Sequence, residues 1–347
     1  MNSKEPVFSD LCVCTHVHYG TCVARSLGLT DASFVSDHRH LHKIDVSDNE
    51  IESLSPFEGL EELLYLKVTH NKVKALDFEP FIVEVLNVSF NSLTKITSFS
   101  AAFLTELDLS HNEITELDEL NLPHLRYLNL SFNKITSLEF VPTLPALRTL
   151  NVSHNMIDTF QPIVGHSEIK TVDISHNCLA SLCTLVPLYS LQSLDLSSNQ
   201  LSDLRETIDN LKDATSLNTL DVRDNPFCSF ESLKVMFTAP QQDTAAPSIP
   251  SSPSFGASSS SSAAASSSSS APVGVQQTDP TSPRSICSKA TTSSGNPRLT
   301  QLRERLREEF LVGLPLLIQM DGTEITAEEK VLAINHKSLS SYIPPRV

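Results

Sequence analysis

One motif of apolar and polar residues, which we call the phrase, recurs along this chain at intervals of 20 to 26 residues. The phrase is apolar-x-x-apolar-x-apolar-x-x-Asn, and Leu125, Leu128, Leu130 and Asn133 form one copy. Because side chains alternate across a strand, the phrase predicts a short strand with one buried and one outward face. Nine copies end on an asparagine, at positions 49, 71, 91, 112, 133, 155, 177, 199 and 225.

Two more apolar residues follow each asparagine, as Ile114 and Leu117 follow Asn112, and they return the chain over the core. An amide buried in the turn after a strand needs hydrogen-bond partners. We therefore expect each asparagine to bond to the backbone of the neighbouring repeat. No single repeat can bury its own apolar face, so the repeats must stack and both ends need caps.

The period and the phrase resemble the leucine-rich repeat. This resemblance implies an α/β leucine-rich repeat solenoid, with a curved parallel β-sheet on the concave face and short helical or irregular segments on the convex face. The array of about nine repeats covers residues 41–237, after an N-terminal cap over residues 1–40. Such stacks present long surfaces for binding, so a binding function is the first expectation.

The composition changes after the array, because residues 238–297 are mostly Ser, Ala, Pro and Thr. Such a segment has too little apolar surface to offset its ordering entropy, so we predict a disordered insertion. An amphipathic helix follows, with Leu299, Leu302, Leu306 and Phe310 on one face.

Motifs on both sides of this insertion carry a more specific resemblance. Asn225-Pro226-Phe227-Cys228 closes the array, and a strand and turn over 314–322 precede a capping box of Thr326 and Glu329. They are similar to the C-terminal cap of the intracellular group typified by the regulatory subunit of protein phosphatase one. That group keeps the two halves adjacent. The resemblance thus implies one cap split by the insertion, with its second half over 298–336 and a tail over 337–347.

The formal net charge of −16 lies on the array, since residues 1–237 hold 32 acidic and 16 basic residues. An acidic surface argues against nucleic-acid binding, which requires basic residues that displace counterions. It favours a protein partner with a basic surface. We expect a monomer that binds no nucleic acid and no membrane.

Other features argue against membrane, secreted and catalytic classes. The longest apolar stretch, 310–318, is too short for a membrane span, and residues 1–10 lack the apolar run of a secretory signal. We therefore predict a cytoplasmic protein, with the cilium, centrosome or nucleus as alternatives. No glycine-rich phosphate loop, nucleophile elbow or His-Glu-x-x-His motif is present, so we expect neither an enzyme nor a cofactor.

The outward strand positions are the candidate partner-binding residues. Most are Asp, Asn, Ser or Thr, the generic filling of such repeats, whereas interface hot spots favour Tyr and Arg. We predict a patch that runs from Tyr65 to Tyr127. The complete set of candidates is Tyr65, Lys67, Val85, Glu106, Asp108, Tyr127, Asn129, Asp173, Asp195 and Arg223.

Two groups of possible metal ligands are interpreted as structural. The segment from Cys12 through Cys14, His16 and His18 to Cys22 departs from the usual spacing of zinc knuckles. Histidines also precede four of the asparagines, as a ladder for metal or pH sensing would require. Ser-His-Asn is an ordinary sequence at this position of such repeats, so no metal is expected at His70, His111, His154 or His176.

Three functional hypotheses follow. The leading one is a scaffold that docks a partner protein on the concave face. The alternative implied by the resemblance is a regulatory subunit that binds the catalytic subunit of protein phosphatase one. A metal-dependent module built on the N-terminal Cys/His segment is the third.

Overall fold

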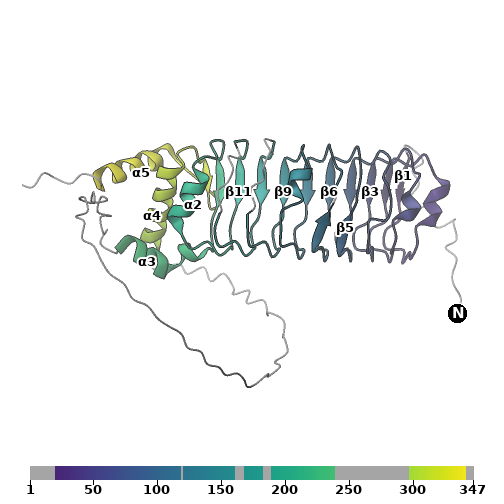
Figure 1. Ribbon diagram of the computed structural model, residues 1–347, viewed down its shortest axis with the longest axis horizontal. Coiled ribbons are helices and arrows are strands. Elements are labelled where there is room, and N and C mark those ends of the chain that lie inside the picture. The colour runs from purple at the N-terminus through teal and green to yellow at the C-terminus, as the bar shows by residue number, and fades with distance from the viewer. Residues whose placement is uncertain (1–19, 119, 161–167, 183–188, 239–296, 341–347) are drawn as a thin grey trace, which may run out of the picture.

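The computed structural model describes residues 20–118, 120–160, 168–182, 189–238 and 297–340. They form an elongated stack of coils whose strands lie side by side along its length (Figure 1). In these ranges the main sheet has 12 strands, in the order β1-β2-β3-β4-β6-β8-β9-β10-β11-β12-β13-β14. The strands are β1 Thr21–Val23, β2 Lys43–Asp45, β3 Tyr65–Lys67, β4 Val85–Asn87, β6 Glu106–Asp108, β8 Tyr127–Asn129, β9 Thr149–Asn151, β10 Thr171–Asp173, β11 Ser193–Asp195, β12 Thr219–Asp221, β13 Gln319–Met320 and β14 Thr323–Glu324.

Equivalent residues of successive repeats pair in register. Leu86 lies opposite Leu107, and Leu107 lies opposite Leu128, in parallel pairings. Only the last pairing of this sheet, β13 with β14, is antiparallel. The predicted parallel solenoid is confirmed.

The core is one continuous apolar column inside the coils. The central residue of each strand of the repeat array is buried, as are the apolar residues that follow the asparagines, such as Ile114 and Ile135. Burying a side chain of this size contributes about 1.5–3 kcal/mol as an upper bound. Stability therefore comes from stacking repeat upon repeat, as the apolar phrase predicts.

The asparagines bond successive coils together. Asn133 is buried, and its Nδ2 donates to the carbonyls of Leu109, Leu130 and Ser131 at 3.0, 2.9 and 3.3 Å. Its Oδ1 accepts from the backbone N–H of Ile114, in the preceding repeat, at 3.0 Å. All nine asparagines make the same kind of bonds, which confirms the predicted role.

The side opposite the main sheet contains turns and few helices. A second sheet pairs β5 (Lys95–Thr97) with β7 (Glu116–Asp118), which the sequence did not predict. Short 3-10 helices also occur there, and α2 (Leu204–Leu211) belongs to the last repeats, with Asp203 as its N-cap. The described 3-10 helices are η2 Ser33–Asp37, η3 Ser55–Phe57, η4 Val141–Thr143 and η5 Pro226–Cys228.

The C-terminal end of the stack is built from segments far apart in sequence (Figure 1). Helix α3 (Phe230–Thr238) follows η5, and α4 (Pro297–Gly313) packs beside it. Strand β13 then joins β12 in parallel, and α5 (Ala327–Ser340) packs on α4. The strand, turn and amphipathic helix predicted for this region are confirmed, although Leu299 is only half-buried.

Two sets of side-chain contacts hold this end together. Phe310 of α4 is buried against Phe227 of η5, with ring centroids 6.2 Å apart. The predicted capping box is present, because the backbone N–H of Thr326 donates to Glu329 and that of Glu329 donates to Oγ1 of Thr326. Arg307 adds an ion pair to Glu329 at 3.1 Å.

Two predictions fall outside the described residues. The predicted disordered insertion coincides with residues 239–296, which the structure does not describe. The same holds for residues 1–19, so of the N-terminal Cys/His segment only Cys22 is described.

Candidate partner-binding surface

Four of the candidate residues form one row across the exposed face of the main sheet. Tyr65 pairs in register with Val85, Val85 with Glu106, and Glu106 with Tyr127. These residues open β3, β4, β6 and β8, so their side chains point to the same face. We call this set the tyrosine row. The structure thus brings together the patch that the sequence predicted.

Tyr127 is the most exposed ring of this row, with 37% of its surface accessible. Partial burial raises the pKa of its hydroxyl, and the nearby carboxylates of Asp108 and Glu106 raise that pKa further. The hydroxyl therefore stays protonated at neutral pH and is available as a hydrogen-bond donor. An exposed tyrosine beside carboxylates suits recognition of a partner with both apolar and basic groups.

Tyr65 stands at the other end of the row in a more basic environment. The Nζ of Lys43 lies 4.6 Å from the centroid of its ring, within the range of a cation–π contact. On the same strand as Lys43, Asp45 pairs with Arg25. Burial raises the pKa of Asp45, but hydrogen bonds from Arg25 and Ser47 outweigh this effect and keep it below its usual value.

A second row lies two residues further along the same strands and contains Lys67, Asp108 and Asn129. It runs in register from Lys67 through Asn87 and Asp108 to Asn129. Oδ1 of Asp108 accepts from the backbone N–H and Oγ of Ser110, at 3.0 and 2.7 Å. These bonds close a local turn at the end of the strand. The carboxylate oxygen is therefore already engaged and is less available to a ligand.

The remaining candidates lie apart from this patch. Asp173 and Asp195 pair in register on β10 and β11, with β9 between them and the tyrosine row. Burial raises the pKa of Asp195, and the charges of Asp221 and Asp173 raise it too. Arg223 forms an ion pair with Asp221, which occupies part of its guanidinium. This end of the sheet face is acidic.

Sequence reasoning missed a column of aromatic rings at the turn after the strands. His70, Phe90, His111, Phe132 and His154 stack in order, and His176 completes the stack. Neighbouring centroids are 4.0–4.2 Å apart, and the rings are within 12° of parallel. All six residues have positive φ, a backbone region that histidine tolerates better than most residues. The missed signal was the shared position of the two phenylalanines directly before Asn91 and Asn133.

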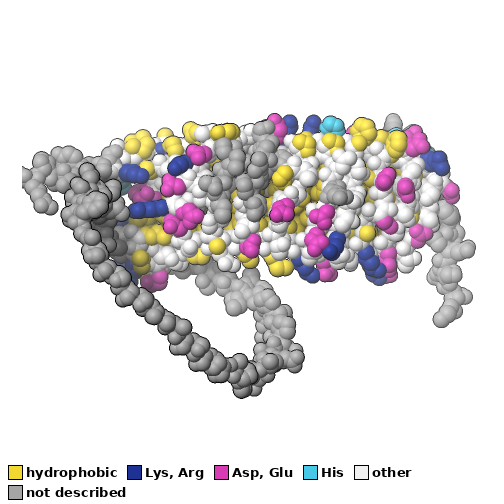
Figure 2. All heavy atoms as spheres, viewed as in Figure 1, with side chains coloured by type: hydrophobic (Ala, Val, Ile, Leu, Met, Phe, Trp, Pro, Cys, Tyr) yellow, Lys and Arg dark blue, Asp and Glu magenta, His cyan; other side chains and the backbone are white. Residues whose placement is uncertain are grey.

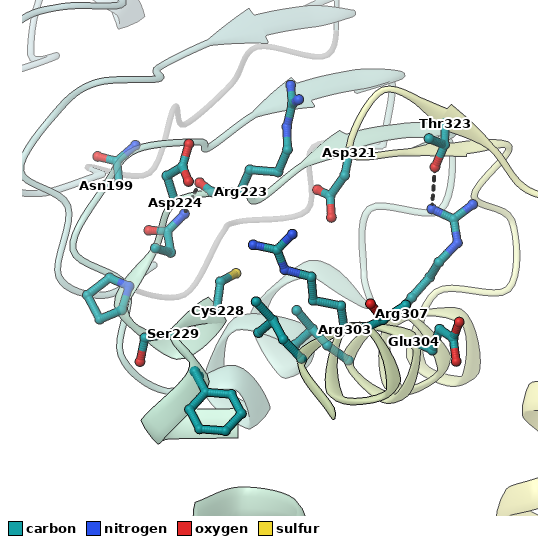
Figure 3. A pocket seen from close by; sticks show the side chains of 16 residues that line it. Asn199, Arg223, Asp224, Cys228, Ser229, Arg303, Glu304, Arg307, Asp321 and Thr323 are labelled. Carbon is teal, nitrogen blue, oxygen red and sulfur yellow. Dashed lines mark hydrogen bonds between the residues drawn. The ribbon is translucent and has the colours of Figure 1, made fainter. Parts of the chain in front are cut away.

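A pocket of about 960 Å³ opens between the last repeat and α4. Figure 3 shows Arg303 pointing into it from α4, between Cys228 and Asp321. Burial raises the pKa of the Cys228 thiol to about 12, so the thiol is not a ready nucleophile. Burial likewise raises the pKa of Asp321, whose Oδ1 accepts from the backbone N–H of Val222 at 3.0 Å. The pocket therefore mixes cationic, acidic and apolar groups.

The part of the chain that the structure describes contains neither a cluster of metal ligands nor a membrane-spanning helix. Within those ranges no three His, Cys, Asp or Glu side chains gather as the ligands of a metal ion would. Among the described helices, none combines the length and the apolar character needed to cross a membrane.

Comparisons with known proteins agree with the repeat and the fold. Family models for "Leucine Rich repeats (2 copies)" match residues 102–143 and 123–165, and one for "Leucine Rich Repeat" matches residues 190–211. These segments therefore carry leucine-rich repeats, and the molecule is a leucine-rich repeat solenoid by fold. No curated protein sequence matches the chain.

Several solved structures are similar to this chain. The functional domain of InlJ from Listeria monocytogenes is 27% identical, with a TM-score of 0.47 over 59% of this chain and 49% of that one. The leucine-rich repeat domain of APL1B is 22% identical, with a TM-score of 0.49 over 59% and 61%. The protein LIC12759 of Leptospira interrogans is 24% identical, with a TM-score of 0.42 over 56% and 57%. The matched region thus spans about half to three fifths of their lengths.

Proposed function

We propose that this protein is a non-catalytic scaffold that binds a partner protein on the exposed face of its main sheet. The observation that carries this proposal is the tyrosine row, in which two tyrosines and a glutamate lie on neighbouring strands. Tyrosine supplies a large contact area with little loss of side-chain entropy and is enriched at binding hot spots.

The dimensions of the row set the size of the contact. It crosses three strand spacings, which is about 14 Å. A stable interface needs about 800 Å² on each side, more than one such row provides. The partner must therefore extend along the sheet towards β10 and β11, where Asp173 and Asp195 present carboxylates. A basic surface on the partner would complement them.

The test is affinity purification with mass spectrometry on a Tyr65→Ala/Glu106→Ala/Tyr127→Ala variant. A matched control, Glu139→Ala/Met156→Ala/Asp158→Ala, changes three exposed side chains outside the strands. We expect at least one partner to be lost from the first variant and kept by the control, with both variants folded by circular dichroism. An unchanged set of partners would show that the tyrosine row is not the binding site.

A regulatory subunit of protein phosphatase one is the alternative function. The observation that favours it is the C-terminal end, where the Asn225–Cys228 motif precedes α3 and β13 joins β12. Co-purification of the phosphatase catalytic subunit would support this alternative, and its absence at high protein concentration would exclude it.

The proposed scaffold is monomeric and cytoplasmic, with the cilium, centrosome and nucleus as alternative locations. The net charge of −16 supports a monomer, since like-charged arrays repel each other. Light scattering at physiological salt tests the oligomeric state, and imaging of a tagged full chain tests the location.

A further inference from the structure

A row of three basic residues lies along the edge where β8, β9 and β10 begin. Arg126, Arg148 and Lys170 each directly precede one of these strands, and we call this set the cationic edge. The carbonyl of Arg126 accepts from the backbone N–H of Arg148 at 2.9 Å, and that of Arg148 accepts from Lys170 at 2.9 Å. The three residues are therefore stacked at one strand spacing, about 4.8 Å.

The cations of this edge are incompletely neutralised, although the protein is acidic overall. Arg148 lies 3.8 Å from Glu168, whereas neither Arg126 nor Lys170 forms an ion pair with any residue in the described ranges. On the opposite side of the coils, Lys72, Lys74, Lys95 and Lys134 each pair with a glutamate at 2.5–3.0 Å. Like charges in adjacent repeats repel each other, and fold stability does not explain why they are gathered here.

Exposed aromatic side chains flank the cationic edge on both sides. Phe81 and Phe103 precede β4 and β6, and Tyr189 precedes β11; they are 65%, 54% and 63% exposed. Figure 2 shows Lys/Arg and histidine side chains on the upper long edge of the stack, with hydrophobic and Asp/Glu side chains beside them, whereas Lys/Arg side chains on the lower edge lie next to Asp/Glu. A shallow pocket of about 280 Å³ opens between Arg126 and Arg148, beside His124.

We propose that the cationic edge, together with Phe103 and Tyr189, docks an acidic segment of a partner protein that has apolar residues at its ends. Charge complementarity selects the acidic centre, because guanidinium groups bind carboxylates in bidentate fashion. Phe103 and Tyr189 are four strand spacings apart, about 19 Å, which an extended segment of about six or seven residues spans. The inference rests on the proposed function only in taking the partner to be a protein, and its surface is separate from the tyrosine row.

The test uses a fluorescein-labelled peptide of five glutamates between two phenylalanines, with fluorescence anisotropy at low salt. The Arg126→Ala/Arg148→Ala/Lys170→Ala variant should bind this peptide at least tenfold more weakly than the wild type. The control, Lys72→Ala/Lys74→Ala/Lys134→Ala, removes the same charge from the opposite side and should bind within twofold of the wild type. A Phe103→Ser/Tyr189→Ser variant should weaken binding of this peptide but not of plain pentaglutamate.

Two results would overturn the proposal. Equal weakening of peptide binding by the cationic-edge variant and by its lysine control would show a general effect of net charge. Tighter binding of an oligothymidylate of similar length, lost in the same variant, would show a nucleic-acid surface. Failure of the peptide to bind would not affect the test of the tyrosine row, because that test uses cellular partners. Likewise, an unchanged set of partners in the tyrosine-row test would not affect the peptide measurement.

Discussion

At the scale of single residues, the asparagine column bonds each coil to the next. Replacing Asn133 with alanine leaves the buried N–H of Ile114 without its acceptor. It also removes one of the two amide donors from each of the carbonyls of Leu109 and Leu130. One buried unsatisfied N–H costs about 1–3 kcal/mol and each lost hydrogen bond about 1 kcal/mol, so we expect Asn133→Ala to lower the free energy of unfolding by about 3 kcal/mol. Urea denaturation followed by circular dichroism measures this loss.

Asn121 provides the control for this prediction. It is exposed, and its Nδ2 donates to the exposed Oγ of Ser100 at 3.1 Å. Asn121→Ala should change the stability by no more than about 0.5 kcal/mol. Similar losses at Asn133 and Asn121 would contradict the role that we assign to the column.

The stacked rings give a pH dependence at the same scale. Burial lowers the pKa of His154, and the charge of the adjacent His176 lowers it further. The unfolded chain therefore binds this proton more readily, so the stability from neutral His154 is present above about pH 6.5 and is lost as the pH falls through the lowered pKa. We expect a smaller decrease in Tm between pH 7.5 and 5.5 in His154→Phe than in the wild type.

His124→Phe is the matched control for that measurement, because His124 is exposed and lies outside the stack. It should keep the pH dependence of the wild type. If His154→Phe showed the full wild-type decrease, the stack would not be the origin of the effect.

At the scale of elements, Phe310 is a central apolar contact of the C-terminal segments, beside the buried Leu302 and Leu306 of the same helix. Phe310 is fully buried and packs on Phe227. Truncating a buried phenylalanine to alanine costs about 3–5 kcal/mol, so Phe310→Ala should destabilise α4 and β13 first. Hydrogen exchange of the variant, compared with the wild type, should accelerate more in 297–320 than in β6 and β8. Val331→Ala, at an exposed position of α5, should leave the exchange pattern unchanged.

The elements were predictable to the extent that a repeating phrase defines them. The strands, the asparagine bonds and the amphipathic α4 follow from local spacing, because each depends on residues close together in the chain. The β5–β7 sheet was not predictable, since it depends on two coils whose turns adopt extended backbone in register. The ring stack was missed for a related reason, because phenylalanine and histidine occupy one column only when coils are superimposed.

At the scale of the whole molecule, candidate surfaces depend on which residues the stacking brings together. The tyrosine row was predicted, since outward strand positions follow from the phrase. The cationic edge was not, because Arg126, Arg148 and Lys170 are single charges 22 residues apart. Their proximity exists only after the coils have stacked. The total charge of −16 therefore conceals a basic surface.

The connection between α3 and α4 gives the prediction that concerns the whole chain. Nη1 of Arg305 donates to the carbonyl of Phe237 at 3.4 Å, so α4 packs against the end of the array. The start of α4 lies eight residues before Arg305, about 12 Å along the helix. A flexible linker of ten residues has a root-mean-square reach of about 17 Å, which bridges this gap.

Replacing residues 239–296 with ten Gly/Ser residues should therefore preserve the fold. Loop closure costs about 0.6 kcal/mol per doubling of length, so the shorter chain should be about 1.5 kcal/mol more stable. Urea denaturation of both chains measures the difference, with a scrambled 239–296 segment as the length-matched control. If the shortened chain were less stable and the scrambled chain equally weakened, residues 239–296 would contribute sequence-specific contacts to this end of the molecule, and the prediction of a disordered insertion would be wrong.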